Sequence, residues 1–193
     1  MMSMLNTDRS VDEYFSKVND ALSRLDRKSM NLFINKILET YDNGGTIYLF
    51  GNGGSGANAS HICGDMLKGL SYGKDKRFRA VCLNDNNAAM MALANDVSYD
   101  DIFVEQLKNF LTDKDLVVGL SGSGNSMNVV KALEYAKSKG ASTVALCGYT
   151  GGKIKEIADI PVHVPIDDME ISEDVHLVIA HCMKRIIYEY LKK

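Results

Sequence analysis

The sequence predicts an α/β fold, a three-layer αβα sandwich built on a five-stranded parallel sheet. Five short apolar runs carry this prediction, because they lack the alternation of apolar and polar residues that a half-exposed strand shows. Segments with helical periodicity lie between the runs, and such alternation produces right-handed βαβ units with helices on both faces of the sheet. The runs are 46–50 (TIYLF), 79–84 (RAVCLN), 115–121 (DLVVGLS), 142–148 (STVALCG) and 160–165 (IPVHVP).

Helical periodicity also frames the predicted sheet. Residues 11–25 place their apolar side chains on one stripe, and residues 30–41 form a second helical stretch before the first strand. Residues 170–191 predict one long helix after the last strand, with apolar residues on more than one face. A helix of that kind is usually buried on both sides, and we expect a partner subunit to cover one of them.

Length and composition are those of one ordinary globular domain. The chain has 193 residues, of which 46% are hydrophobic and 24% charged, enough for a sizeable core. We predict one domain over residues 1–193, with an N-terminal helical arm at 1–43 and the αβα core at 44–193. The net charge of −3 and the scattered basic residues argue against a nucleic-acid partner.

The sequence also predicts a cytoplasmic protein. No apolar stretch reaches the roughly 18 residues that indicate a membrane span, so we expect no membrane partner. The first ten residues, MMSMLNTDRS, lack the apolar centre of a signal peptide. The four cysteines, Cys63, Cys82, Cys147 and Cys182, lie far apart without a CxxC pair. This pattern indicates free, buried thiols in a reducing compartment.

Two loops rich in glycine and serine follow predicted strands. GNGGS at 51–55 comes after the first strand, and SGSGNS at 121–126 comes after the third. Glycines allow the backbone to approach a phosphate closely, and the first N–H groups of a following helix can donate to it. The hydroxyls of the second loop also suit a terminal phosphate. Because ligands of parallel sheets bind at the carboxyl ends of strands, the loops predict one phosphorylated ligand held between them.

Two other interpretations of these loops are open. GNGGSG at 51–56 matches the GxGxxG pattern of dinucleotide-binding proteins, which is a weak signal alone. The second strand has no acidic residue at its tip to hold a ribose, since Asp85 falls in the following loop, and the GxxxxGK[ST] pattern is missing. The second loop alone also suits a turn that caps a helix at 128–139. The presence of two such loops on neighbouring strands favours the phosphate site.

Four motifs together resemble the sugar isomerase (SIS) domain. They are GNGGS followed by A-x-x-x-H, SGSGNSxN, ANDxxYD at 94–100, and E-D-x-H-x-x-x-x-H at 173–181. Within that family the chain is similar to the bacterial phosphoheptose isomerases, which interconvert sedoheptulose 7-phosphate and D-glycero-D-manno-heptose 7-phosphate for heptose precursors of lipopolysaccharide or capsule. The resemblance implies a flavodoxin-like sheet, a homotetramer with active sites between subunits, and one zinc ion per site.

Histidines and carboxylates on two predicted helices are the candidates for metal binding and proton transfer. His61 and Asp65 are four residues apart and therefore share one helix face. Nitrogen and oxygen ligands from two helices suit a tetrahedral zinc site, although each histidine alone is better explained as a core or surface residue. The resemblance implies His61, Asp65, Glu173 and His181 as the metal ligands. It implies Asp65 or Glu173 as the catalytic base and His181 as the acid.

The resemblance also implies a set of substrate-binding residues in the loops and beyond them. Serines and glycines of the two loops are expected to hold the phosphate, and polar residues elsewhere to bind the sugar hydroxyls. The phosphate set comprises Gly53, Gly54, Ser55, Ser121, Gly122, Ser123 and Ser126, and the sugar set Asn52, Asn95, Asp96 and Glu173.

The chain departs from the phosphoheptose isomerase pattern at four places. Asp65 stands where those enzymes carry glutamate, Glu173 where they carry glutamine, Lys68-Gly69 where they carry an arginine, and Gly122 where they carry threonine. An aspartate carboxylate reaches roughly 1.5 Å less far than a glutamate carboxylate, by bond lengths of that order. Asp65 can therefore bind a metal and still fail as a base, and Glu173 adds a carboxylate that can either serve as the base or strengthen metal binding.

Two other functions suit the same domain. One SIS relative binds the bacterial replication initiator protein as a non-catalytic tetramer, and other relatives isomerise different phosphosugars. The presence of both His61 and His181 favours an enzyme, because a scaffold needs neither.

Overall fold

A computed structural model describes residues 7–192, which form a five-stranded parallel sheet in the order β2-β1-β3-β4-β5. The predicted domain bounds and the predicted lack of a signal peptide also involve residues 1–6 and 193, which lie outside the described residues. The predicted α/β sandwich on a five-stranded parallel sheet is confirmed. The strands are β1 (Thr46–Gly51), β2 (Arg79–Cys82), β3 (Leu116–Ser121), β4 (Ser142–Cys147) and β5 (Ile160–His163).

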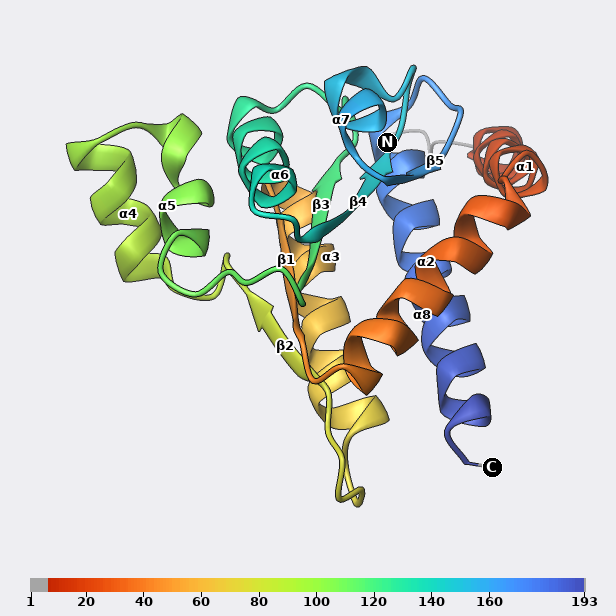
Figure 1. Ribbon diagram of the computed structural model, residues 1–193. Coiled ribbons are helices and arrows are strands. Elements are labelled where there is room, and N and C mark those ends of the chain that lie inside the picture. Colours follow the sequence, from red (N-terminus) through yellow and green to blue (C-terminus); the bar gives the residue numbers. More distant parts are fainter. Residues whose placement is uncertain (1–6, 193) are drawn as a thin grey trace, which may run out of the picture.

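The two faces of the sheet bury separate hydrophobic clusters, which gives the molecule its three layers (Figure 1). Along β1, Ile47 and Leu49 belong to one cluster, whereas Tyr48 and Phe50 belong to the other, as the alternation of side chains along a strand requires. Helices α1 (Asp8–Ser23), α2 (Arg27–Asp42), α3 (Gly53–Gly64) and α8 (Met169–Tyr190) contribute to the first cluster, and α5 (Val104–Leu107), α6 (Met127–Ser138) and α7 (Gly152–Ile157) to the second.

Strand β2 is covered on one face only, contrary to the prediction that every strand is buried on both faces. Arg79 and Val81 are exposed, while Ala80 and Cys82 are buried. Figure 1 shows the reason, since α4 (Asn87–Asp96) and α5 lie to one side of β2 rather than over it. No residue of α4 is buried. Strand β5 also alternates, with Pro161 and His163 half-buried.

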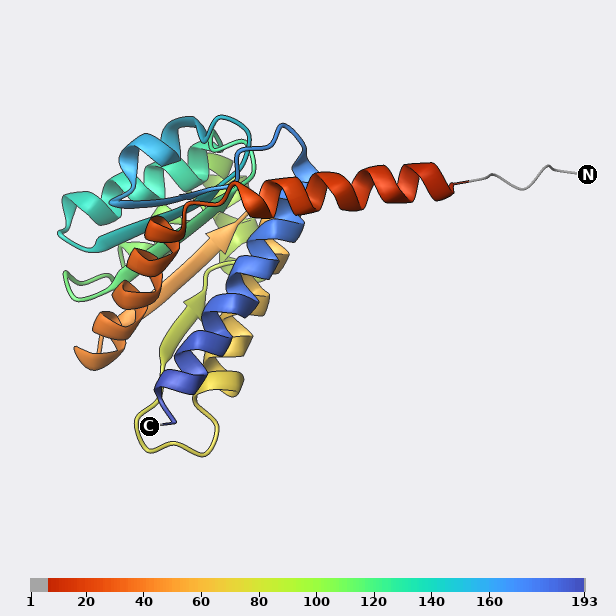
Figure 2. The ribbon, with the colours of Figure 1, turned by 90° about the vertical axis from the view of Figure 1, so that its right-hand side faces the viewer.

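The two leading helices and the long last helix are present where the sequence predicts them. Asp26 caps α2 by accepting hydrogen bonds from Lys28 N and Ser29 N, and Asp168 caps α8 by accepting one from Ile171 N. Helix α1 extends away from the sheet (red in Figure 2) and buries only Ala21. Apolar side chains of its stripe, such as Val11 and Phe15, are therefore left exposed by the rest of this chain.

Three of the four cysteines are buried, as predicted, and all four are free. Burial raises the pKa of the Cys63 thiol to about 11 and those of Cys82 and Cys147 to about 12, so these thiols stay protonated at neutral pH. Cys182 is exposed, so the prediction of a buried thiol is wrong there. Within residues 7–192, no helix combines the length and the apolar character needed to cross a membrane.

Candidate active site

The two glycine- and serine-rich loops lie side by side because β1 and β3 are neighbours in the sheet. Gly51 at the end of β1 pairs with Leu120 near the end of β3, so the chain leaves both strands at the same edge. A cavity of about 260 Å³ opens between the loops. It is lined by Asn52, Gly53, Gly54, Ser55, Ser121, Gly122, Ser123, Ser126, Met169 and Glu173, and we call it the cradle.

Two glycines of the cradle have no room for a side chain. A Cβ on Gly54 would lie 2.1 Å from Glu173 Oε2, and a Cβ on Gly122 would lie 2.3 Å from Met169 Sδ. Gly53 has a φ of 53°, which glycine adopts more readily than other residues. The absence of side chains at Gly54 and Gly122 therefore lets Glu173 and Met169 of α8 lie directly against the backbone of the two loops.

Donors of both loops face this cavity. Helix α3 begins at Gly53, and Asn52 makes no side-chain hydrogen bond to its first turn, so the first N–H groups lack intrahelical partners. Ser126 stands at the N-cap of α6, with its hydroxyl 3.1 Å from the Ser121 hydroxyl and without a side-chain bond to its own helix. N–H groups and hydroxyls at two helix N-termini are a typical anion site.

A network of side-chain hydrogen bonds fixes one wall of the cradle, and Asn52 is the one member that the sequence predicted as a site residue. Asn52 Nδ2 donates to Asn128 Oδ1 at 3.0 Å, and Asn128 Nδ2 donates back to Asn52 Oδ1 at 2.9 Å. Tyr99 OH also donates to Asn52 Oδ1, at 3.0 Å. Asn128 is buried and is the last residue of the SGSGNSxN motif, which was the signal that could have identified it.

Asn95 and Asp96 are not among the residues that line the cradle. Both are exposed at the end of α4, where Asn95 Nδ2 donates to Asp96 Oδ1 at 2.7 Å. Asp96 instead lines a hollow between α4 and α5. A single chain therefore does not bring this pair to the phosphate loops.

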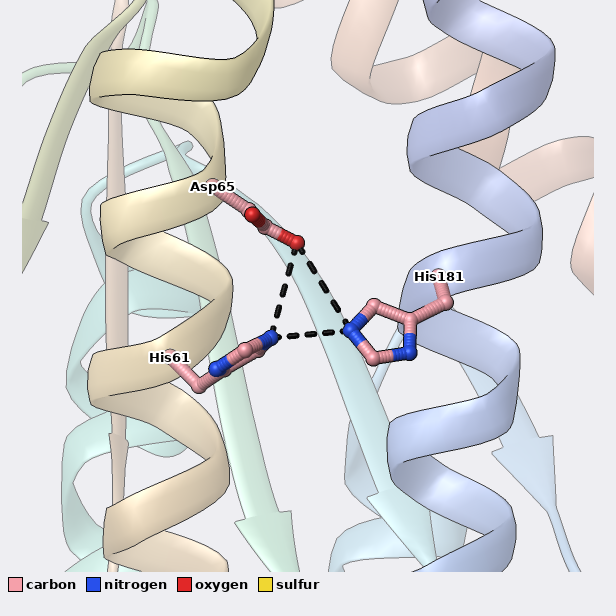
Figure 3. A group of neighbouring side chains, drawn as sticks. All are labelled: His61, Asp65 and His181. Atoms are coloured by element: carbon pink, nitrogen blue, oxygen red, sulfur yellow. Dashed lines mark hydrogen bonds and ion pairs between the residues drawn. The ribbon is translucent and has the colours of Figure 1, made fainter.

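His61, Asp65 and His181 form a cluster between α3 and α8 (Figure 3). The two Nε2 atoms are 2.9 Å apart, and Asp65 Oδ2 lies 3.6 Å from His61 Nε2 and 3.8 Å from His181 Nε2. Asp65 begins a π-helical stretch, η1 (Asp65–Leu70), that continues α3. Stretches of this kind are frequent at functional sites.

The cluster fits a zinc ion. Zinc bonds of about 2.0–2.1 Å at tetrahedral angles separate neighbouring ligand atoms by about 3.3 Å, and the three observed distances lie on either side of that value. Two imidazoles and one carboxylate are also a ligand set that leaves a fourth position open for water or substrate, as catalytic zinc sites do.

Glu173 lies apart from the other three predicted metal ligands. Its carboxylate lines the cradle against Gly54, and it does not belong to the His61–Asp65–His181 group. Glu173 and His181 are eight residues apart on α8, which corresponds to about 12 Å along the helix axis. Asn58 Nδ2 holds this turn of α8 by donating to the Glu173 carbonyl oxygen at 2.9 Å.

Lys184 and His176 of α8 lie near the site, and their positions could not be read from sequence spacing alone. Lys184 Nζ pairs with Asp65 Oδ1 at 2.5 Å, an interaction that sequence reasoning missed although Lys184 lies only three residues after His181. His176, inside the E-D-x-H motif, is completely buried in the core, and burial lowers its pKa to about 4. His176 therefore stays neutral at physiological pH and takes no part in the cluster.

Comparison with known proteins identifies the family. The pattern of the SIS domain matches residues 13–148. The chain belongs to the SIS domain family. This membership agrees with the cradle at the ends of β1 and β3, which is where open parallel sheets bind ligands.

Two relatives and one solved structure that this chain is similar to are named as phosphoheptose isomerases. The chain is 35% identical to the probable phosphoheptose isomerase of Thermoplasma volcanium, with 93% of this chain and 91% of that protein covered. It is 36% identical to the phosphoheptose isomerase of Aneurinibacillus thermoaerophilus, with 80% and 77% covered. The solved structure of the phosphoheptose isomerase from Neisseria gonorrhoeae superposes with a TM-score of 0.87 at 28% identity, covering 94% of this chain and 98% of that one.

Proposed function

We propose that this chain is a phosphoheptose isomerase, which interconverts sedoheptulose 7-phosphate and D-glycero-D-manno-heptose 7-phosphate. The observation that carries the proposal is that α3 and α8 supply residues both to an anion cradle and to a cluster of two imidazoles and a carboxylate. The names of relatives at 35% and 36% identity support the substrate. The product serves the synthesis of heptose precursors for lipopolysaccharide or capsule.

The cradle binds the phosphate of the substrate. The N–H groups of the first turn of α3, together with the hydroxyls of Ser55, Ser121, Ser123 and Ser126, donate to its oxygens. Asn52, held by Asn128 and Tyr99, fixes the adjoining wall. Binding energy gained at the phosphate is then used to orient the distant reactive carbons.

The spacing of the two sites along α3 suits a sugar of this length. Ser55 and His61 are six residues apart, or about 9 Å along the helix axis. The eight bonds from C1 to phosphorus in an open-chain heptose 7-phosphate span about 9–10 Å, at roughly 1.2 Å per bond. A substrate with its phosphate in the cradle therefore has its carbonyl end near the cluster.

Proton transfer occurs at the cluster. Isomerisation moves a proton between C1 and C2 through an enediol, with one group acting on carbon and another on oxygen. Of the two carboxylates proposed as the base, Asp65 lies beside the imidazoles whereas Glu173 lies at the phosphate end. For the cluster without a metal, we therefore assign the carbon proton to Asp65 Oδ2 and the oxygen proton to His181 Nε2, since neither atom can carry a proton while it binds zinc. Zinc held by His61, Asp65 and His181 would polarise the carbonyl.

A homotetramer in the cytoplasm, with sites between subunits, is part of this proposal. Val11 and Phe15 on α1 are 45% and 60% exposed, and Val178 and Ile186 on α8 are 44% and 48% exposed, so both helices offer apolar surface to a partner. Asn95 and Asp96, which this chain leaves at its surface, would then reach the sugar from a neighbouring subunit.

The test is aldose formation from sedoheptulose 7-phosphate by the purified protein, with and without added zinc. We expect His181→Gln to abolish turnover and to leave binding of the phosphosugar nearly unchanged, because His181 is outside the cradle. Full turnover by that variant would refute the role of His181. No turnover by the wild-type chain would refute the enzyme, and turnover of a different phosphosugar alone would refute the substrate.

A further inference from the structure

The Asp65 carboxylate is divided between two sets of partners. Its Oδ1 is 2.5 Å from Lys184 Nζ, while its Oδ2 faces His61 and His181 at 3.6 Å and 3.8 Å. We propose that Lys184 is a positioning residue, which holds Asp65 by one oxygen and so presents the other to the two imidazoles. This inference rests on the metal site of the proposed function.

The ion pair is sheltered enough to hold a side chain in place. The Asp65 and Lys184 side chains are 20% and 34% exposed, whereas exposed pairs such as Arg9–Glu13 have side chains that are 92% and 59% exposed. Pairs in water contribute little because solvent screens them, and burial reduces that screening. Among residues 7–192, Lys184 is the only lysine or arginine within ion-pair distance of Asp65.

A glycine provides the space that this lysine occupies. A Cβ on Gly69 would lie 2.6 Å from Lys184 Cε, 3.1 Å from its Nζ, and 3.6 Å from Asp65 Oδ1. Gly69 belongs to η1, and a glycine inside a helix costs about 1 kcal/mol relative to alanine. An alanine here would displace the end of Lys184. The absence of a side chain at Gly69 therefore allows Lys184 to reach Asp65.

Gly64 is a matched position for comparison. It lies in the last turn of α3, immediately before Asp65, and a Cβ there would meet nothing within 4 Å. Alanine at Gly64 or at Gly69 makes the same chemical change in one continuous helical segment. Only the change at Gly69 crowds Lys184, so the pair separates the effect on Lys184 from a general effect on the helix.

Holding a ligand in place affects metal affinity. Groups that orient a metal ligand from behind change metal affinity typically by about 10–100-fold when they are removed. Asp65 has two rotatable side-chain bonds, and with Lys184 removed the other partners found for its carboxylate are the two imidazoles. The zinc affinity of the full chain is therefore the direct measure of this role.

The experiment is a zinc titration of the full chain against a chromophoric chelator, for the wild type and three variants. Lys184→Met keeps the length of the side chain and removes its charge, Gly69→Ala displaces the lysine, and Gly64→Ala is the control. We expect zinc affinity to fall about 10–100-fold in Lys184→Met and by a smaller factor in Gly69→Ala. Gly64→Ala should match the wild type. The visible spectrum of the cobalt(II)-substituted protein should change in the same two variants, because it reports the geometry of the ligands.

Each other outcome overturns a defined part of the inference. Unchanged or tighter zinc binding by Lys184→Met refutes the positioning role, with the metal site itself intact. A loss in Lys184→Met but not in Gly69→Ala supports Lys184 and refutes the part assigned to Gly69. A wild-type chain that does not bind zinc refutes both the metal site and this inference, and its turnover of sedoheptulose 7-phosphate then decides separately whether the proposed enzyme survives.

Discussion

The Glu173 carboxylate lies inside the cavity where the phosphate is proposed to bind, so removing its charge should tighten phosphate binding. A Cβ on Gly54 would lie within 2.1 Å of Glu173 Oε2, which places the carboxylate over the first turn of α3. We take a separation of roughly 6 Å between this carboxylate and a phosphate in the cradle, which is about twice the length of a hydrogen bond. At that distance charges of −1 and −2 repel by roughly 1.4 kcal/mol even at the dielectric constant of water. We therefore predict that Glu173→Gln binds phosphate about tenfold more tightly.

The assay is calorimetric titration with inorganic phosphate and with sedoheptulose 7-phosphate, at low and at high salt. The gain in affinity should shrink at 1 M salt, where the screening length falls to about 3 Å. Glu189→Gln is the matched control, since it removes the same charge from an exposed position at the other end of α8. Equal affinities of Glu173→Gln and the wild type at low salt would refute the placement of the carboxylate beside the phosphate.

The same variant distinguishes the two candidate bases. If Asp65 takes the carbon proton, Glu173→Gln keeps its kcat while its Kd falls. General base catalysis contributes a factor of about 10²–10⁴ to the rate. A loss of kcat of that size in Glu173→Gln would instead assign the base to Glu173.

Three further changes test other parts of the structure. Gly122→Thr should crowd the Met169 sulfur, weaken phosphosugar binding and lower the unfolding free energy by about 1–3 kcal/mol, measured by titration and by urea unfolding. Asn128→Ala should cost about 1–3 kcal/mol of unfolding free energy because it leaves Asn52 without its buried partner, and unchanged urea midpoints would contradict this. His176 has its folded pKa lowered from 6.5 to about 4, so the unfolded chain binds more protons between these values, and stability falls as pH drops from 6.5 towards 4. The contribution of His176 to this loss is roughly 2 kcal/mol at pH 5, and urea midpoints of His176→Leu should show a correspondingly weaker dependence on pH.

The sheet and the cradle could be predicted because each depends on residues that are close together in the sequence. GNGGS and SGSGNS both follow buried strands, and the parallel arrangement of β1 and β3 then brings the loops to one edge. The helix face shared by His61 and Asp65 follows from a spacing of four residues. Helix α4 could not be placed in the same way, because none of its residues is buried and its sequence does not reveal which surface it covers.

The contacts between α3 and α8 decide the rest of the site, and they depend on how two distant segments pack. The motif at 173–181 offers Glu173 and His181 as partners for the same cluster, but eight residues of helix separate them, and only His181 lies opposite His61. The position opposite Asp65 Oδ1 is taken by Lys184, one turn further along α8. A lysine near a helix end is usually a solvated surface residue, and only the packing of α8 against η1 and the missing side chain at Gly69 bring this one to the carboxylate. Asp65 is one methylene shorter than the glutamate that the family pattern predicts, and Lys184 fixes its orientation. The zinc affinity of Lys184→Met measures how far this fixed orientation compensates for the shorter side chain.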